Sequence, residues 1–286
     1  MGILFKIIGV MVAAFVLLVI GQLGFGAVSS ATSTLGLVPS FVLSALIGLG
    51  LVIFGTSLFN RLVLKGSLPE LIGQDNKAGG TIIPKWFVFG LAMIWGVISV
   101  FWISGFGYFQ TYYQETVMTG LAISACVALM SGISEEILFR YLVYGYMRGK
   151  MPKLWAALIC GVVFGVLHLN QVANVQDGAI LMIAAIGVSL LFAAIYERTG
   201  TIWAPALVHV AWNMFAIKIG FVVTNGFDNP EDAGFAYAGF HIEAPNSFLA
   251  GGSFGVEQSA PALLMYFVLA FAIIQLGRRD QDQSEA

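Results

Sequence analysis

Charged side chains are scarce in this sequence. Asp, Glu, Lys and Arg make up 10% of its 286 residues, and hydrophobic residues make up 59%. An average soluble domain has about 25% charged residues, so the shortage excludes an ordinary soluble domain. The formal net charge of −2 gives no sign of a basic surface, and we expect no nucleic-acid partner. Composition therefore predicts a polytopic membrane protein.

Cysteine and two catalytic signatures are also scarce or missing. Cys126 and Cys160 both lie in apolar segments, which favours small core side chains over a disulfide framework or a thiolate metal site. The His-Glu-x-x-His signature of many zinc peptidases does not occur. No Gly-x-Ser-x-Gly surrounds Ser134, so we expect its hydroxyl to pack between helices.

Long apolar runs are what the chain has instead. Windows of about 20 apolar residues predict an all-α fold with eight transmembrane helices in one integral membrane domain, residues 1–286. The predicted spans are residues 5–27, 36–59, 86–108, 117–148, 153–172, 178–197, 201–223 and 259–277.

Lys and Arg follow a regular pattern along these spans. They precede the first span, occupy the even-numbered connections and follow the last span, whereas the odd-numbered connections have none. Because basic residues stay on the cytoplasmic side, we expect both termini in the cytoplasm and the connection 224–258 outside, as a flexible or interfacial cap. The Gly- and Ala-rich chain, without an organelle-retrieval tail, is typical of a bacterial cell-membrane protein.

Two adjacent carboxylates, Glu135 and Glu136, interrupt the fourth span, and Arg140 follows one turn later. An ionisable side chain near the bilayer centre costs roughly 2.5–3.5 kcal/mol, so we expect these residues to be functional. Glu136 and Arg140 share one helix face and can pair, whereas Glu135 lies about 100° around the helix. The spacing therefore predicts that Glu135 is left unpaired, as a general base working near neutral pH requires.

Among the other polar residues within the spans, His168, His209 and Asn213 are the candidates for chemistry. If the fourth and fifth spans form a hairpin, Glu136 and His168 lie at about the same distance from its turn and therefore at the same depth. His209 and Asn213 are one turn apart on one face of the seventh span, at a similar depth. We expect these side chains to meet in one polar pocket below the cytoplasmic surface.

These residue types suit hydrolysis. Glu135, helped by His168, would take a proton from water, while His209 and Asn213 would donate hydrogen bonds to the oxyanion. Alternatively, Zn²⁺ bound by Glu135, His168 and His209 would activate the water, and the sequence leaves the two mechanisms open. A proton-coupled transporter is one alternative, although no Gly- or Pro-broken helices recur in matching halves of the sequence. Haem ligation by the two histidines is another, although adjacent carboxylates would be unfavourable next to an apolar macrocycle.

Three motifs, each in its own span, together resemble the CPBP family (CAAX protease and bacteriocin-processing, or Abi). This family of intramembrane endopeptidases includes the type II CAAX prenyl proteases, the Ras-converting group. The motifs are Glu135-Glu136-x-x-x-Arg140, Phe164-x-x-x-His168 and His209-x-x-x-Asn213, all within residues 117–223, the expected catalytic core.

The resemblance implies an eight-helix membrane hydrolase with a conical cavity open to the cytoplasm. By position, it makes Glu135 and His168 the water-activating pair and His209 and Asn213 the oxyanion donors, supported by Glu136, Arg140 and Phe164. It also implies a membrane-associated peptide or protein as substrate. The family has been described both as glutamate-dependent and as metallopeptidase, and some members as scaffolds or immunity proteins, so both alternatives stay open.

Overall fold

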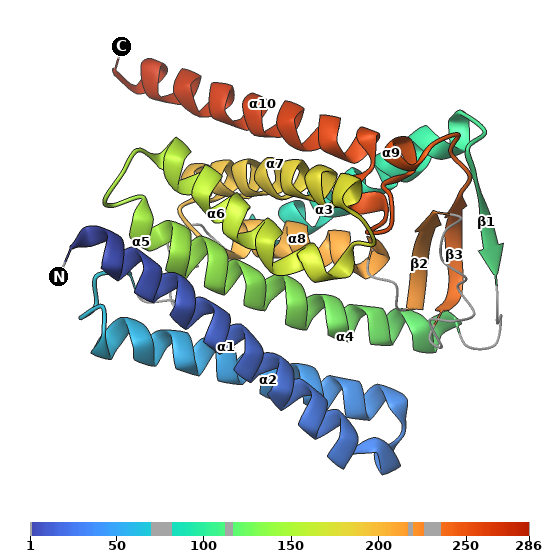
Figure 1. The fold of residues 1–286 in the computed structure, drawn as a ribbon, viewed down its shortest axis with the longest axis horizontal. Helices are drawn as coiled ribbons and strands as arrows, with labels where there is room; N and C mark the ends of the chain where they lie inside the picture. Colours follow the sequence, from blue (N-terminus) through green and yellow to red (C-terminus); the bar gives the residue numbers. More distant parts are fainter. Residues whose placement is uncertain (1, 70–81, 112–116, 217–219, 226–235, 286) are drawn as a thin grey trace.

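The computed structural model describes residues 2–69, 82–111, 117–216, 220–225 and 236–285, which form a bundle of long helices with a small sheet at one end (Figure 1). Within this part of the chain, seven helical segments are long and apolar enough to cross a membrane, which confirms an all-α, multi-pass membrane fold. They are built on α1 (Ile3–Ala31), α2 (Leu37–Leu62), α3 (Ile82–Ile103), α4 (Val117–Glu135), α6 (Lys153–His168), α7 (Val175–Thr199) and α10 (Ala260–Glu285).

The central helix changes its winding at the two carboxylates. α4 ends at Glu135 and continues as a π-helix, η4 (Glu136–Tyr144), and then as α5 (Gly145–Met147). All nine η4 residues are buried. Figure 1 shows this long helix crossing the molecule with α1 and α2 on one side and α6, α7 and α8 on the other. π-helical turns are rare and often occur at functional sites.

Glycines let the helices that carry the polar residues approach closely. A Cβ on Gly132 of α4 would lie 2.9 Å from the backbone nitrogen of Val210 in α8. A Cβ on Gly161 of α6 would lie 2.8 Å from Cα of Ile186 in α7. Small residues of this kind are typical of tightly packed membrane helices, and here they place α8 directly against the end of α4.

The predicted seventh span, residues 201–223, is wrong as a continuous helix. The chain forms α8 (Trp203–Ala216), of 14 residues, and then the strand β2 (Gly220–Asn225). A helix of this length rises about 21 Å, less than the roughly 30 Å of the hydrocarbon core. α8 is instead surrounded by other helices and buries most of its residues. An apolar run alone does not distinguish a transmembrane helix from a shorter buried helix followed by a strand.

A three-stranded sheet closes one end of the bundle. Strand β3 (Ala236–Ile242) pairs antiparallel with β1 (Gly107–Thr111) and parallel with β2, in the order β1-β3-β2. The predicted third span therefore also ends early, because α3 stops at Ile103 and β1 begins at Gly107.

The connection predicted as a flexible or interfacial cap, residues 224–258, is folded onto the bundle where the structure describes it. β3 leads to the short helices α9 (Ser247–Ala250) and η7 (Val256–Gln258), and Phe240, Ile242 and Val256 are buried. The flexible alternative is wrong for this part, because apolar side chains scattered through a Gly-rich stretch find partners in the tertiary structure, whereas the interfacial position stays a prediction. Residues 226–235 lie outside the described part of the chain.

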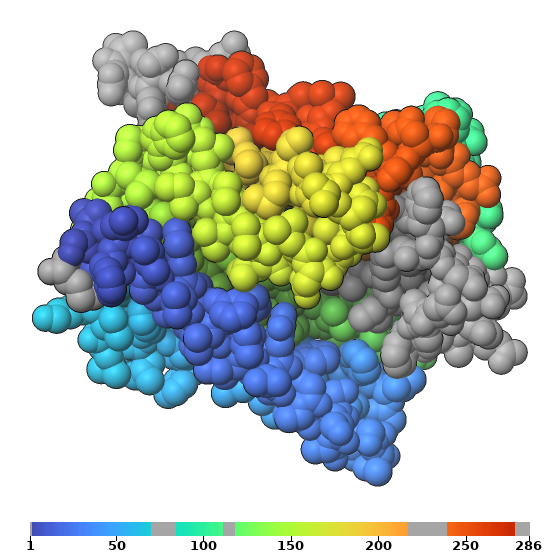
Figure 2. Space-filling model, viewed as in Figure 1, coloured from blue at the N-terminus to red at the C-terminus, as the bar shows by residue number. Residues whose placement is uncertain are grey.

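Both described ends of the chain lie at the same end of the bundle. The start of α1, the turn between α5 and α6 and the end of α10 lie at one end of the molecule, opposite the sheet (Figure 1). The side of the membrane on which this end lies stays a prediction. Figure 2 shows α1, α6 and α10 on one face of the molecule. α1 is the most peripheral of the spans, since it buries only Ile7, Val10, Ala14 and Gly21.

Candidate active site

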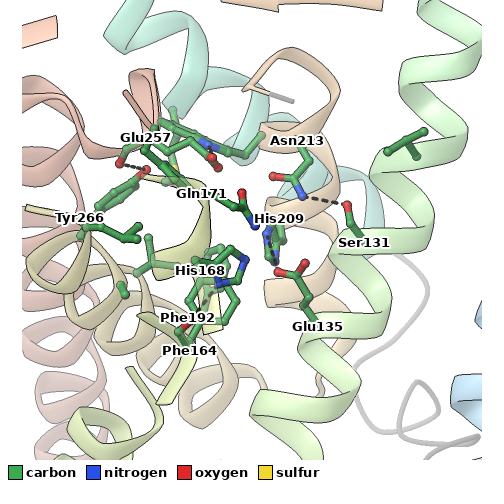
Figure 3. Close-up of a pocket in the computed structure, with 18 of the residues that line it drawn as sticks. Ser131, Glu135, Phe164, His168, Gln171, Phe192, His209, Asn213, Glu257 and Tyr266 are labelled. Atoms are coloured by element: carbon green, nitrogen blue, oxygen red, sulfur yellow. Dashed lines mark hydrogen bonds and ion pairs between the residues drawn. The ribbon is translucent and has the colours of Figure 1, made fainter. Parts of the chain in front are cut away.

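A cavity of about 420 Å³ lies inside the bundle, within the size range of ligand pockets. It brings together the four side chains that the sequence predicted to meet: Glu135 from α4, His168 from α6, and His209 and Asn213 from α8 (Figure 3). Much of the remaining wall consists of aromatic side chains and of further polar ones, namely Gln22, Ser131, Phe164, Gln171, Phe192, Trp212, Phe254, Glu257 and Tyr266.

Glu136 pairs with Arg140, as the spacing predicted. Nε of Arg140 lies 3.3 Å from Oε2 of Glu136, and both side chains are almost fully buried. The guanidinium also donates from Nη1 to Sγ of Cys160 at 3.3 Å and lies over the ring of Phe192, 5.5 Å from its centroid. Cys160 is thus a buried core residue, as expected, and in addition a partner of Arg140.

His209 stands between the two carboxylates. Its Nδ1 lies 3.2 Å from Oε1 of Glu136, and its Nε2 lies 3.7 Å from Oε2 of Glu135. Since the ionised carboxylate of Glu136 only accepts hydrogen bonds, Nδ1 carries a proton and donates it. Glu136 therefore has a second task that sequence spacing did not reveal: it fixes the orientation of His209 and turns Nε2 toward the pocket.

The tautomer of His168 follows from its partner. Its Nδ1 lies 2.8 Å from the carbonyl oxygen of Phe164, one turn earlier on α6. A carbonyl oxygen only accepts, so Nδ1 carries the proton and Nε2 keeps its lone pair. The ring of Phe164 also packs against the imidazole, with centroids 4.3 Å apart. Figure 3 shows His168 and Glu135 on opposite sides of the pocket, both facing its interior.

Asn213 is held by a serine on the neighbouring helix. Its Nδ2 donates to Oγ of Ser131 at 3.0 Å (Figure 3). A side-chain amide has two N–H groups, so this bond orients Asn213 and leaves a second donor for a ligand. The other serine of this segment, Ser134, is buried and donates to Sδ of Met130 at 3.6 Å, in keeping with the packing role expected for it.

Glu257 is the one ionisable carboxyl of the pocket wall that the sequence interpretation missed. Nε1 of Trp212 donates to its Oε1 at 3.1 Å. Burial raises the pKa of Glu257, and the nearby His209 and His168 oppose that rise. No local pattern marked this residue, because it lies in the connection assigned to the outside, far from the motifs in sequence.

The zinc alternative finds no ready set of ligands. No three His, Cys, Asp or Glu side chains within the described residues are grouped closely enough to hold a metal ion. Glu135, His168 and His209 share a cavity but do not form such a cluster. Zinc binding by these residues stays a prediction.

Comparison with known proteins agrees with the geometry. Residues 116–215 match the family model described as Type II CAAX prenyl endopeptidase Rce1-like. The chain is 29% identical over 145 residues to the "Putative membrane peptidase YdiL" of Bacillus subtilis (strain 168); the match covers 45% of this chain and 56% of that protein. The chain thus matches little more than half the length of this relative. No solved structure matches the chain significantly.

Proposed function

We propose that the chain is an intramembrane peptidase of the CPBP family, because residues 116–215 match the Rce1-like CAAX endopeptidase model and a relative described as a putative membrane peptidase is 29% identical. We infer that it hydrolyses a peptide bond of a membrane-associated peptide or protein. The observation that carries the proposal is the division between the two adjacent carboxylates. Glu136 is paired with Arg140, whereas Glu135 faces the cavity without a cation of its own among the described Lys and Arg residues.

Glu135 is the base in this mechanism. A water molecule between Glu135 and His168 donates one proton to the carboxylate, and its oxygen attacks the substrate carbonyl carbon. Nε2 of His168 accepts the second hydrogen bond from this water, because its Nδ1 proton is held by the carbonyl oxygen of Phe164. The two acceptors fix the lone pair of the water toward the substrate.

His209 and Asn213 stabilise the charge that develops on the carbonyl oxygen. A protonated His209 donates from Nε2, since its Nδ1–H is directed at Glu136. The second N–H of Asn213 donates beside it, oriented by Ser131. When the C–N bond breaks, Glu135 passes its proton to the leaving nitrogen and returns to the carboxylate form, so that the protons balance over one turnover.

The substrate is proposed only as a class. A cavity inside a helical bundle fits an extended segment that is already associated with the membrane, and the matching family model is described as a CAAX prenyl endopeptidase. We propose that the pocket opens to the cytoplasm, following the distribution of Lys and Arg in the sequence. Labelling of engineered cysteines at both ends of the chain from either side of the membrane would test this orientation.

The direct test is cleavage of fluorogenic peptides by the purified chain in lipid nanodiscs. The library contains membrane-associated peptides with and without a lipidated cysteine. Glu135→Gln keeps the shape of the side chain and removes the base, so we expect kcat/KM to fall by about 10²–10⁴-fold. The matched control is Glu197→Gln, which alters a carboxylate outside the pocket and leaves activity unchanged.

Zinc content, measured in the same preparations, bears on how water is activated. Stoichiometric zinc that is lost in His168→Ala, with activity lost in parallel, would replace the carboxylate mechanism by the metal mechanism. Full activity of Glu135→Gln on any cleaved peptide would disprove the assignment of the base. A correctly folded wild type that cleaves no peptide in the library would favour a non-catalytic scaffold of the same family.

A further inference from the structure

The wall of the pocket around Glu257 is built differently from the wall around Glu135. Glu257 lies on η7 and is fixed at two points: its carboxylate accepts from Nε1 of Trp212 at 3.1 Å, and its backbone oxygen accepts from the hydroxyl of Tyr266 at 3.1 Å. Trp212 belongs to α8 and Tyr266 to α10, so the side chain of Glu257 is held by α8 and its backbone by α10. The mechanism proposed above does not use it.

The charges around the pocket do not balance. Arg140 is taken up by Glu136, which leaves Glu135 and Glu257 as the carboxyls of the cavity wall. No Lys or Arg occurs among the described residues that line the cavity, and the cationic side chains available to the two carboxyls are His168 and His209. A buried carboxylate without a close cation is costly, and a cationic ligand would remove that cost.

Aromatic rings surround the same carboxyl. The rings of Trp212 and Tyr266 have centroids 5.6 Å apart, and both line the cavity beside Glu257. Faces of Trp and Tyr attract ammonium and guanidinium groups, most strongly where water is excluded. An indole N–H needs only an acceptor, which a glutamine or a backbone carbonyl would supply equally well, so the bond to Trp212 does not by itself require a charged residue at position 257.

We propose that Glu257, Trp212 and Tyr266 form a subsite that binds a cationic group of the substrate, an ammonium or a guanidinium, beside the peptide bond that is attacked at Glu135. The subsite rests on the proposed function of the same pocket. Figure 3 shows Glu257 and Tyr266 on the far side of the cavity from Glu135, with His209 between them. A substrate that reaches from one carboxyl to the other would therefore carry its positive charge close to the cleaved bond but not at it. The cation is either a Lys or Arg side chain or the free amino group of the substrate.

Binding is measured on the full chain carrying Glu135→Gln, so that no turnover is required. The probes are dye-labelled peptides of one sequence: N-acetylated with Lys at a single position, N-acetylated with norleucine there, N-acetylated with Glu there, and norleucine with a free amino terminus. Fluorescence anisotropy in nanodiscs gives each Kd. We expect the Lys peptide or the free-amine peptide to bind at least about tenfold tighter than the neutral one, and the Glu peptide to bind more weakly. The two cationic probes distinguish the side chain from the amino terminus.

The matched variant is Glu257→Gln, which keeps an acceptor for Trp212 and removes the charge. It should abolish the preference for the cationic peptide and leave the Kd of the neutral peptide within about twofold. Equal affinities for all four peptides, or a preference that survives Glu257→Gln, would overturn the subsite. If Glu257→Gln does not fold, the ranking of the Lys, norleucine and Glu peptides on the parent protein decides alone.

The two proposals can fail separately. Cation preference in binding, together with absence of cleavage by wild type, would keep the subsite and refute the peptidase assignment. Cleavage by wild type without any cation preference would keep the peptidase and refute the subsite.

Discussion

Two clusters of charged residues in this bundle differ in how many cations each carboxylate has as partners. At one end of the bundle, Glu197 of α7 pairs with both Arg148 and Lys153 and accepts a hydrogen bond from the hydroxyl of Tyr144 at 3.1 Å. Two cations and one phenol thus surround one carboxylate. In the interior, Arg140 pairs with only one of two adjacent carboxylates, Glu136, and the imidazole of His209 lies between Glu136 and Glu135.

The two clusters differ in their access to water. In the end cluster the side chains of Glu197, Arg148 and Lys153 are 22%, 32% and 65% exposed, whereas those of Glu136 and Arg140 are 2% and 1% exposed. Partly hydrated ion pairs cost little desolvation energy and add little to stability, so the end cluster needs no role beyond helix packing. An ionisable side chain inside a membrane protein is costly, and Glu135 has no Lys or Arg partner among the described residues, which supports the catalytic role that we propose for it.

We expect the largest loss of stability from a substitution at Arg140. Arg140→Met removes the cation and leaves Glu136 buried without its pair, which costs about 3–5 kcal/mol for a buried pair of this kind. The measurement is thermal or denaturant unfolding of the protein in detergent or nanodiscs. Unfolding like that of wild type would show that Glu136 does not need Arg140.

A double variant separates the lost pair from lost packing. Glu136→Gln combined with Arg140→Met leaves no buried charge at these positions, so much of the stability should return. Activity should stay low, because Gln no longer provides the charged partner of Nδ1 of His209. A double variant as unstable as Arg140→Met would assign the effect to packing against Cys160 and Phe192.

Substitutions at Asn213 and Ser131 should change the rate of the reaction rather than stability. Asn213→Ala removes the proposed oxyanion donor and should lower kcat by about 10²–10³-fold with a smaller change in KM. Ser131→Ala removes only the group that orients the amide, and we expect a milder loss of about tenfold or less. Equal effects of the two variants on kcat would show that Asn213 acts through Ser131 in packing, not on the substrate.

The long helices and the shared pocket could be predicted from the sequence because each has a strong local signal. Ionisable residues are rare in the spans, so helical rise and an assumed hairpin of the fourth and fifth spans predicted one polar pocket, and the structure brings Glu135, His168, His209 and Asn213 into one cavity. The pairing of Glu136 with Arg140 followed from their spacing, and it holds although that segment winds as a π-helix.

Other parts of the fold had no such signal. The end of α8 and the strand β2 lie within one apolar run, and hydrophobicity alone does not show where the helix ends and the strand begins. Glu257 joins the site only because β3, α9 and η7 fold the connection back onto α8 and α10. The contact of Glu136 with Nδ1 of His209 depends on the close approach of α4 and α8 at Gly132, which is a tertiary property.

We expect the smallest loss of stability from a substitution in the end cluster. Glu197→Gln keeps an acceptor for Tyr144 and removes the charge that faces Arg148 and Lys153. Because the partners are partly hydrated, the loss of unfolding free energy should be about 1 kcal/mol or less, and raising the salt concentration should shrink it further. Peptidase activity should not change, since Glu197 does not line the cavity. A loss of activity without a loss of stability in Glu197→Gln would mean that the end cluster is coupled to the pocket through α7, and the division between a structural and a reactive cluster would then fail.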